Sequence, residues 1–167
     1  VYTTYAGRLT DEEIFPLMLR MKEAGGLLFY HCENDAITNG LAAGFQRELP
    51  VSCLCWPKSR PDYCEAEAVK RVLALSRAAE VPAYIVHLST KAALDEVILA
   101  RRAGQKVYVE SCPQYLTLTD KCYEKENGLD YVMAPPLRSR GDCNRLWRAL
   151  AQGDIDTVGT DHCSFSR

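Results

Sequence analysis

The chain has 167 residues, 47% of them hydrophobic and 25% charged, and its formal net charge is −2. This composition is typical of a soluble globular domain and excludes collagen, extended disorder and membrane-spanning helices. Because the two signs of charge are balanced and no long run has one sign, the sequence predicts no nucleic-acid partner and no membrane partner. A small, nearly neutral ligand fits these charges better.

Eight cysteines in 167 residues are fewer than a disulfide-stapled secreted scaffold contains, and a chain of this length can bury a core without disulfides. No two of them have the Cys-x-x-Cys spacing of a zinc ribbon or a redox motif. We therefore expect buried, reduced thiols and a cytoplasmic location.

Amphipathic segments alternate with short apolar runs along the chain, which predicts helices and strands alternating in an α/β fold. In chain order, the expected elements are a helix at 11–24, a strand at 27–31, a helix at 35–49, a helix at 65–80, a strand at 83–87, a helix at 91–102, a strand at 106–110, an irregular segment at 111–137, a helix at 142–151 and a strand at 155–161. Thr10 is the expected N-cap of the first helix, which Gly25-Gly26 ends, and Pro50 is expected to end the second helix.

Three of the predicted strands end in a residue that can bind a metal: His31, His87 and Asp161. Strand side chains alternate between faces, so each shares a face with the residues two and four positions before it, whose apolar members should line an interior. In a parallel sheet the three meet at the carboxyl edge, where two imidazoles and a carboxylate can bind zinc or manganese. A single His at a strand end is more often a packing residue, and this reading is preferred for His162. The common position of the other three favours a metal site.

Five short segments, in this order, resemble the dihydropyrimidinase and D-hydantoinase branch of the cyclic amidohydrolases over essentially the whole chain. The segments are His31-Cys32-Glu33-Asn34, Val86-His87-Leu88-Ser89, Glu110-Ser111-Cys112-Pro113-Gln114-Tyr115-Leu116, Ala134-Pro135-Pro136-Leu137-Arg138 and Gly159-Thr160-Asp161-His162-Cys163. Allantoinases and dihydroorotases tend to carry His where Gln114 stands, so the resemblance is closer to the hydantoinases.

The resemblance implies a TIM (β/α)8 barrel of the metal-dependent hydrolase type. Such a barrel needs about 250 residues, so residues 1–167 are expected to form one partial amidohydrolase barrel domain. We expect its C-terminal half, from the end of strand four to strand eight, with the N-terminal half and a C-terminal region missing. By analogy with the family, the intact protein is expected to be a homo-oligomer, with a tetramer as the common form.

Members of this family hold two divalent metal ions, usually zinc, through an early His-x-His pair, a carboxylated bridging Lys, two later His and an Asp. The resemblance makes His31 and His87 the two later His on one metal. It makes Asp161 the Asp that binds the other metal and carries a proton. Tyr5 matches a catalytic Tyr that contacts the substrate and donates to the oxyanion, and Ala134 matches a main-chain contact to the substrate ring. The His-x-His pair and the Lys would lie outside this chain.

The implied activity is hydrolysis of the cyclic amide C–N bond of hydantoins or dihydropyrimidines, as in pyrimidine catabolism. A metal-bridging hydroxide would attack a small cyclic ureide or imide. Alternatives stay open: a non-catalytic scaffold of the collapsin-response-mediator type, whose members look depleted in metal ligands, or an allantoinase-like or dihydroorotase-like hydrolase. We expect the isolated chain to lack a complete binuclear centre and to be inactive.

Overall fold

The computed structural model describes residues 1–45 and 52–163. Helices and strands alternate along most of the chain, which confirms the predicted α/β class. The α-helices are α1 (Asp11–Ala24), α2 (Asp35–Phe45), α3 (Cys55–Ser59), α4 (Asp62–Ala79), α5 (Lys91–Arg102), α6 (Pro113–Thr117) and α7 (Arg140–Gln152). The 3-10 helices are η1 (Asp120–Glu124) and η2 (Gly128–Tyr131), and the strands are β1 (Leu28–Tyr30), β2 (Ala83–Ile85), β3 (Val107–Ser111) and β4 (Thr157–Val158).

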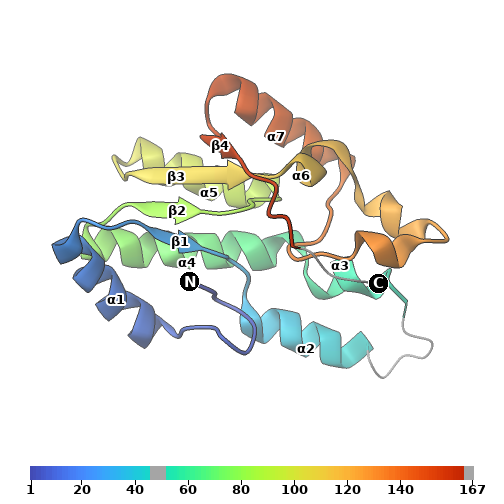
Figure 1. Cartoon of the computed structure of the whole chain (residues 1–167), viewed down its shortest axis with the longest axis horizontal. Helices are drawn as coiled ribbons and strands as arrows, with labels where there is room; N and C mark the ends of the chain where they lie inside the picture. The colour runs from blue at the N-terminus through green and yellow to red at the C-terminus, as the bar shows by residue number, and fades with distance from the viewer. Residues whose placement is uncertain (46–51, 164–167) are drawn as a thin grey trace.

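In the described part of the chain, four strands form one sheet in the order β1-β2-β3-β4, and each neighbouring pair is parallel (Figure 1). Spatial order therefore equals chain order, as in successive βα units whose helices cross from one strand to the next. All four carboxyl ends lie at the same edge of this sheet.

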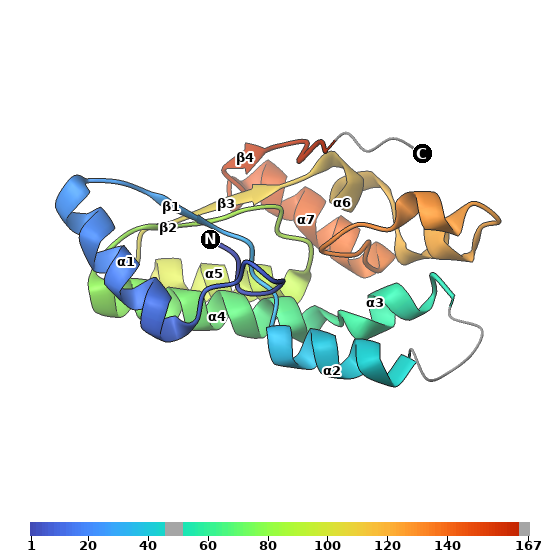
Figure 2. The ribbon, with the colours of Figure 1, turned by 60° about the horizontal axis from the view of Figure 1, so that its bottom comes forward.

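Helices α4 and α5 pack together and against the sheet, α4 on β2 and α5 on β3 (Figure 2). The core lies between these layers and contains fully buried residues such as Val69, Val72, Ile85, Val97 and Val109. Each such aliphatic side chain contributes about 1.5 to 3 kcal/mol when it leaves water. The described part of the chain contains no helix long and apolar enough to cross a membrane.

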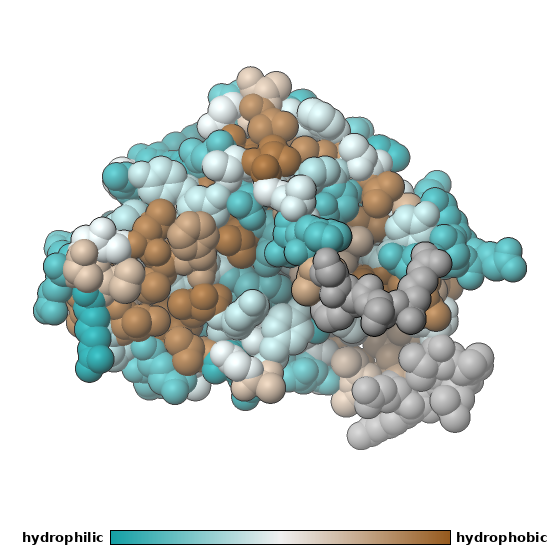
Figure 3. Space-filling model, in the orientation of Figure 1, coloured by the Kyte–Doolittle hydropathy of each residue, from teal (hydrophilic) through white to brown (hydrophobic). Residues whose placement is uncertain are grey.

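The opposite face of the sheet leaves aromatic side chains open to solvent. Phe29 on β1 is 49% exposed, and its ring centroid lies 4.2 Å from that of Tyr84 on β2. Figure 3 shows hydrophobic residues reaching the surface over α1 and β1. This face is therefore hydrophobic but only partly covered by the described residues.

The predicted ends of the first helix are confirmed. Thr10 and Glu13 form a capping box at the start of α1, and Gly25 ends it in the left-handed conformation at φ 65°. Thr90 caps α5 by accepting a hydrogen bond from the Ala93 backbone N–H at 3.1 Å. The bounds 11–24 and 91–102 are confirmed.

Other predicted elements differ in length. Helix α2 is described as far as Phe45, and residues 46–49 of its predicted span, with Pro50, lie outside the described residues. Strand β4 has two residues rather than the predicted seven. The segment 111–137 contains α6, η1 and η2 instead of being irregular. These helices have four or five residues each, too few to show a helical period in the sequence.

The predicted faces of β2 are wrong. Its register pairs Phe29 with Tyr84 and Tyr30 with Ile85, so Phe29 and Ile85 lie on opposite faces and line no common interior. Ile85 instead packs into the core beneath the sheet. His87 follows the end of the strand and has a left-handed backbone, with φ 41°. Its side chain direction is therefore set by this turn and not by strand alternation.

Candidate functional site

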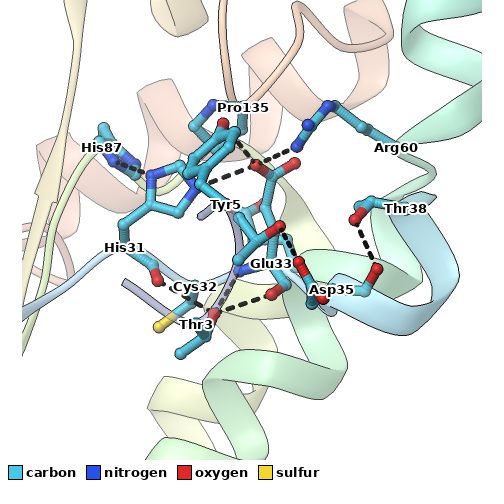
Figure 4. Close-up of polar contacts among 12 residues, drawn as sticks. Thr3, Tyr5, His31, Cys32, Glu33, Asp35, Thr38, Arg60, His87 and Pro135 are labelled. Carbon is cyan, nitrogen blue, oxygen red and sulfur yellow. Dashed lines mark hydrogen bonds and ion pairs between the residues drawn. The ribbon is translucent and has the colours of Figure 1, made fainter. Parts of the chain in front are cut away.

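Two buried imidazoles meet at the carboxyl edge of β1 and β2. His31 Nδ1 lies 2.8 Å from His87 Nε2, and the ring centroids are 4.6 Å apart (Figure 4). The residues are 5% and 6% exposed. Burial and, second, the neighbouring His31 lower the pKa of His87 to about 3. His87 is therefore neutral near pH 7, the state in which imidazole binds metals.

Glu33 lies directly behind His31 and is fully buried. Its Oε2 accepts from His31 Nε2 at 2.9 Å and from Arg60 Nη1 at 2.7 Å. Burial alone would raise the pKa of Glu33, but the His31 hydrogen bond and the Arg60 charge lower it below its ordinary value. Glu33 is therefore an ionised carboxylate inside the protein.

A second buried carboxylate holds the loop that follows His87. Glu65 on α4 accepts from the Ser89 backbone N–H at 2.8 Å and from Ser89 Oγ at 2.9 Å. Arg138 links a partner of Glu65 to a partner of Glu33: its Nε donates to Ser89 Oγ at 3.0 Å, and its Nη1 donates to the carbonyl of Arg60. Burial raises the pKa of Glu65 despite these partners. One polar network thus supports both histidines.

Tyr5 packs against His31 and reaches Glu33. Its ring centroid is 5.2 Å from that of His31, and its hydroxyl lies 3.4 Å from Glu33 Oε2. Tyr5 has φ 72°, a strained value for a residue with a Cβ. Burial, followed by the Glu33 charge, raises the pKa of Tyr5 to about 12. The phenol therefore keeps its proton and can donate a hydrogen bond.

The structure does not bring Asp161 into this cluster. Asp161 is exposed, follows the two-residue strand β4 and has φ 48°. Within residues 1–45 and 52–163, no three or more His, Cys, Asp or Glu side chains are placed to hold a metal ion together. Two of the three predicted metal ligands are therefore in contact, and the third is not.

Ala134 is half-buried in the segment before α7. The residues on either side of it are anchored: Met133 O accepts from Trp56 Nε1 at 2.6 Å, and Pro135 O accepts from Tyr115 Oη at 2.7 Å. The main chain at Ala134 is thereby fixed, as a main-chain contact to a ligand would require.

The paired imidazoles fit a divalent metal. Glu33 engages His31 Nε2, which leaves Nδ1 facing His87 Nε2. Among the described residues, His87 Nδ1 is a buried atom without a hydrogen-bond partner. Two Zn–N bonds of about 2.0 to 2.1 Å at a tetrahedral angle separate their nitrogens by about 3.3 Å, so a small outward movement of the rings from 2.8 Å would admit an ion.

Comparisons with known proteins agree with this arrangement. D-phenylhydantoinase from Escherichia coli O1:K1 / APEC is 42% identical over 171 residues, which cover 99% of this chain and 36% of the relative. The solved structure of dihydropyrimidinase from Brevibacillus agri NCHU1002 superimposes with a TM-score of 0.96 at 36% identity, over 99% of this chain and 37% of that one. Over nearly its whole length, the chain matches the dihydropyrimidinase and hydantoinase family.

The L-hydantoinase (dihydropyrimidinase) from Arthrobacter aurescens is a more distant hydantoinase structure, with a TM-score of 0.87 and 31% identity over 95% of this chain and 36% of that one. No protein-family model matches the chain. The chain spans about a third of the length of the hydantoinase relatives that it matches.

Sequence reasoning missed Glu33, Arg60 and their connection to both histidines. Glu33 had a signal, because it lies two residues after His31 and residues two apart in an extended segment point the same way. Arg60 had none, because it reaches Glu33 from the loop between α3 and α4, 27 residues later in the sequence.

Proposed function

We propose that the protein to which this chain belongs hydrolyses the cyclic amide C–N bond of hydantoins or dihydropyrimidines in a metal-dependent reaction. The observation that carries the proposal is the 42% identity to a D-phenylhydantoinase, because it extends over 99% of the chain and so includes both facing histidines. The buried imidazole pair supports it independently, since it brings two imidazole nitrogens together at one point.

His31 and His87 would hold one of two divalent ions, with zinc as the expected metal. When bound, such ions make a water molecule more acidic and polarise the carbonyl group of the substrate. Asp161 would take a proton from the attacking water and pass it to the leaving ring nitrogen. Its exposed, less constrained position suits a group that must serve both atoms.

Tyr5 would donate a hydrogen bond from its protonated hydroxyl to the oxyanion that forms at the carbonyl carbon. The anchored main chain at Ala134 would hold the ureide ring. Both roles agree with a phenol of raised pKa and with the fixed carbonyls on either side of Ala134.

We also propose that residues 1–167 form part of an amidohydrolase barrel and are inactive alone. The sequence has three histidines, at 31, 87 and 162, and so contains no His-x-His pair for the second metal. Its relatives are nearly three times as long. The homo-oligomeric state and the cytoplasmic location belong to the same proposal.

A hybrid enzyme tests the activity. This chain would replace its matching segment in the E. coli D-phenylhydantoinase, and ring opening would be measured with phenylhydantoin, dihydrouracil, allantoin and dihydroorotate. We expect turnover of hydantoins or dihydrouracil that a chelator abolishes and that His87→Ala removes. A folded, zinc-loaded hybrid with no turnover would contradict the function, and preference for allantoin or dihydroorotate would favour the related hydrolases. Full turnover by the isolated chain would contradict the proposal that residues 1–167 form only part of a barrel.

A further inference from the structure

One carboxylate oxygen of Glu33 contacts two of the residues to which the proposed function gives roles. Glu33 Oε2 accepts from His31 Nε2 at 2.9 Å and from Arg60 Nη1 at 2.7 Å, and the Tyr5 hydroxyl lies 3.4 Å away (Figure 4). The side chain is 0% exposed. Burial of a carboxylate is costly unless it is hydrogen-bonded, and here its hydrogen bonds all lie at Oε2, because Oε1 has no partner among the described residues.

The hydrogen bond to Glu33 decides which nitrogen of His31 carries the proton. A carboxylate that is paired with an arginine only accepts hydrogen bonds, so a His31 ring that carries one proton must hold it on Nε2. Nδ1 is then the nitrogen with a free lone pair, and it faces His87. Without Glu33, the ring could hold its proton on either nitrogen and rotate.

Glu33 is itself held from two directions. Thr3 Oγ1 donates to the Glu33 carbonyl at 2.7 Å and accepts from the Glu33 backbone N–H at 2.9 Å. Arg60 binds the carboxylate, and its guanidinium carbon lies 4.5 Å from the centroid of the Trp56 ring. Both the backbone and the carboxylate of Glu33 therefore have fixed partners.

We propose that Glu33 is a positioning residue that fixes His31 as the Nε2-protonated tautomer and so presents Nδ1 to a metal shared with His87. Histidine ligands of metals are commonly oriented in this way by a carboxylate on the other ring nitrogen. The proposal rests on the proposed function only for the metal; the tautomer is a property of the metal-free chain.

The tautomer is measured on the 167-residue chain without metal or substrate. Long-range ¹H–¹⁵N correlation spectra in mildly alkaline buffer distinguish a protonated from an unprotonated ring nitrogen, and His31→Gln and His162→Asn assign the three histidines. We expect His31 to show a protonated Nε2 and an unprotonated Nδ1. The opposite tautomer, or an averaged one, in the wild-type chain would overturn the proposal without any variant of Glu33.

Variants then distinguish a positioning role of Glu33 from a contribution of Glu33 to the stability of the whole chain. Glu33→Leu combined with Arg60→Met removes both buried charges together, and we expect the His31 tautomer to become mixed. Zinc affinity at this site, identified as the binding that His87→Ala weakens, should fall by about tenfold to a hundredfold in the double variant. Glu33→Gln keeps an acceptor oxygen and should preserve the tautomer. Glu67→Gln, on a partly exposed carboxylate that pairs with Arg71, is the matched control and should change neither readout.

The outcomes distinguish this proposal from the proposed function. A fixed tautomer that persists in the folded double variant would overturn the role of Glu33, whatever the hybrid enzyme does. If the double variant does not fold, the wild-type and Glu33→Gln spectra still decide the tautomer. An inactive hybrid whose His31 keeps the expected tautomer would contradict the function and leave the positioning role of Glu33 intact.

Discussion

The two ends of the sheet's carboxyl edge are built very differently. At the β1 and β2 end, His31, His87 and Glu33 are each at most 6% exposed and make hydrogen bonds to one another or to Arg60. At the β4 end, both strand residues and Asp161 are exposed. One end is a preformed group of buried side chains, and the other is a short strand at the surface.

The difference shows where this chain places its buried charged side chains. Glu33 and Glu65 reach the β1 and β2 end from different elements, and Arg60 and Arg138 connect them. Buried charges with several partners hold side chains rigidly, which suits ligands that must keep one geometry. The β4 end lacks such support among the described residues, which suits a group that moves a proton between two atoms.

Removal of Arg60 is expected to have the largest effect, because it leaves the buried Glu33 carboxylate without its cation. Arg60→Met should lower the free energy of unfolding by about 3 to 5 kcal/mol, as for other broken buried ion pairs. Urea unfolding followed by circular dichroism measures this loss. Arg71→Met, which breaks the partly exposed pairs with Asp11 and Glu67, is the control and should cost less than about 1 kcal/mol. Equal losses would show that the buried Arg60–Glu33 pair contributes no more to stability than a partly exposed pair.

Zinc binding by the chain should depend only on the β1 and β2 end of the sheet's carboxyl edge. His31→Ala and His87→Ala should each weaken zinc binding at least about tenfold, because each removes one of two facing ligands. Asp161→Asn should change it less than about twofold, since Asp161 belongs to no group of ligands in the described residues. Competition with a chromophoric chelator measures these affinities. A large effect of Asp161→Asn would show that the β4 end closes onto the histidines.

The buried Glu65 predicts a pH dependence that belongs to the β1 and β2 end. Its pKa is raised in the folded protein, so between the unfolded value of about 4.3 and the folded value the folded state binds more protons. The free energy of unfolding therefore falls as pH rises through this window. Glu65→Gln should flatten that slope, whereas Glu67→Gln should leave it unchanged. Unfolding curves across this range would contradict the assignment if both variants kept the wild-type slope.

Local signals in the sequence predicted much of the fold. Thr10 and Gly25 were predicted to bound the first helix, and both do so through hydrogen bonds with neighbouring residues. The presence of four parallel strands also followed from local apolar runs. The short helices between 111 and 137 did not, because each depends on packing against α7 or on its own turn geometry rather than on a repeated apolar face.

The site was predicted in part for the same reason. The contact between His31 and His87 was predicted, but for the wrong reason. Strand alternation places Ile85 in the core, and the φ of 41° at His87 turns its ring toward His31. When a residue other than glycine adopts the left-handed backbone conformation, no local sequence pattern predicts it. Arg60 reaches Glu33 through tertiary structure alone, so no spacing in the sequence predicts this contact.

The smallest expected effect lies at the β4 end, where Gly159 faces Glu110. A Cβ on Gly159 would lie 2.7 Å from Glu110 Cδ and 2.8 Å from its Oε2. These atoms end a flexible side chain, so Gly159→Ala should only displace the carboxylate, at a cost of about 0.5 to 1.5 kcal/mol for the altered rotamer. Urea unfolding measures this cost.

A double-mutant cycle shows whether Glu110 is the cause. In a Glu110→Ala background the clash is gone, and Gly159→Ala should be neutral or stabilise the chain by up to about 1 kcal/mol, because alanine restricts the unfolded state. Gly40→Ala, in α2 with no atom within 4 Å of the new Cβ, is the control and should stabilise by about 0.5 to 1 kcal/mol. A cost that persists without Glu110 would mean that the backbone at β4 resists change, and the contrast between a rigid and an adaptable end would fail at this point.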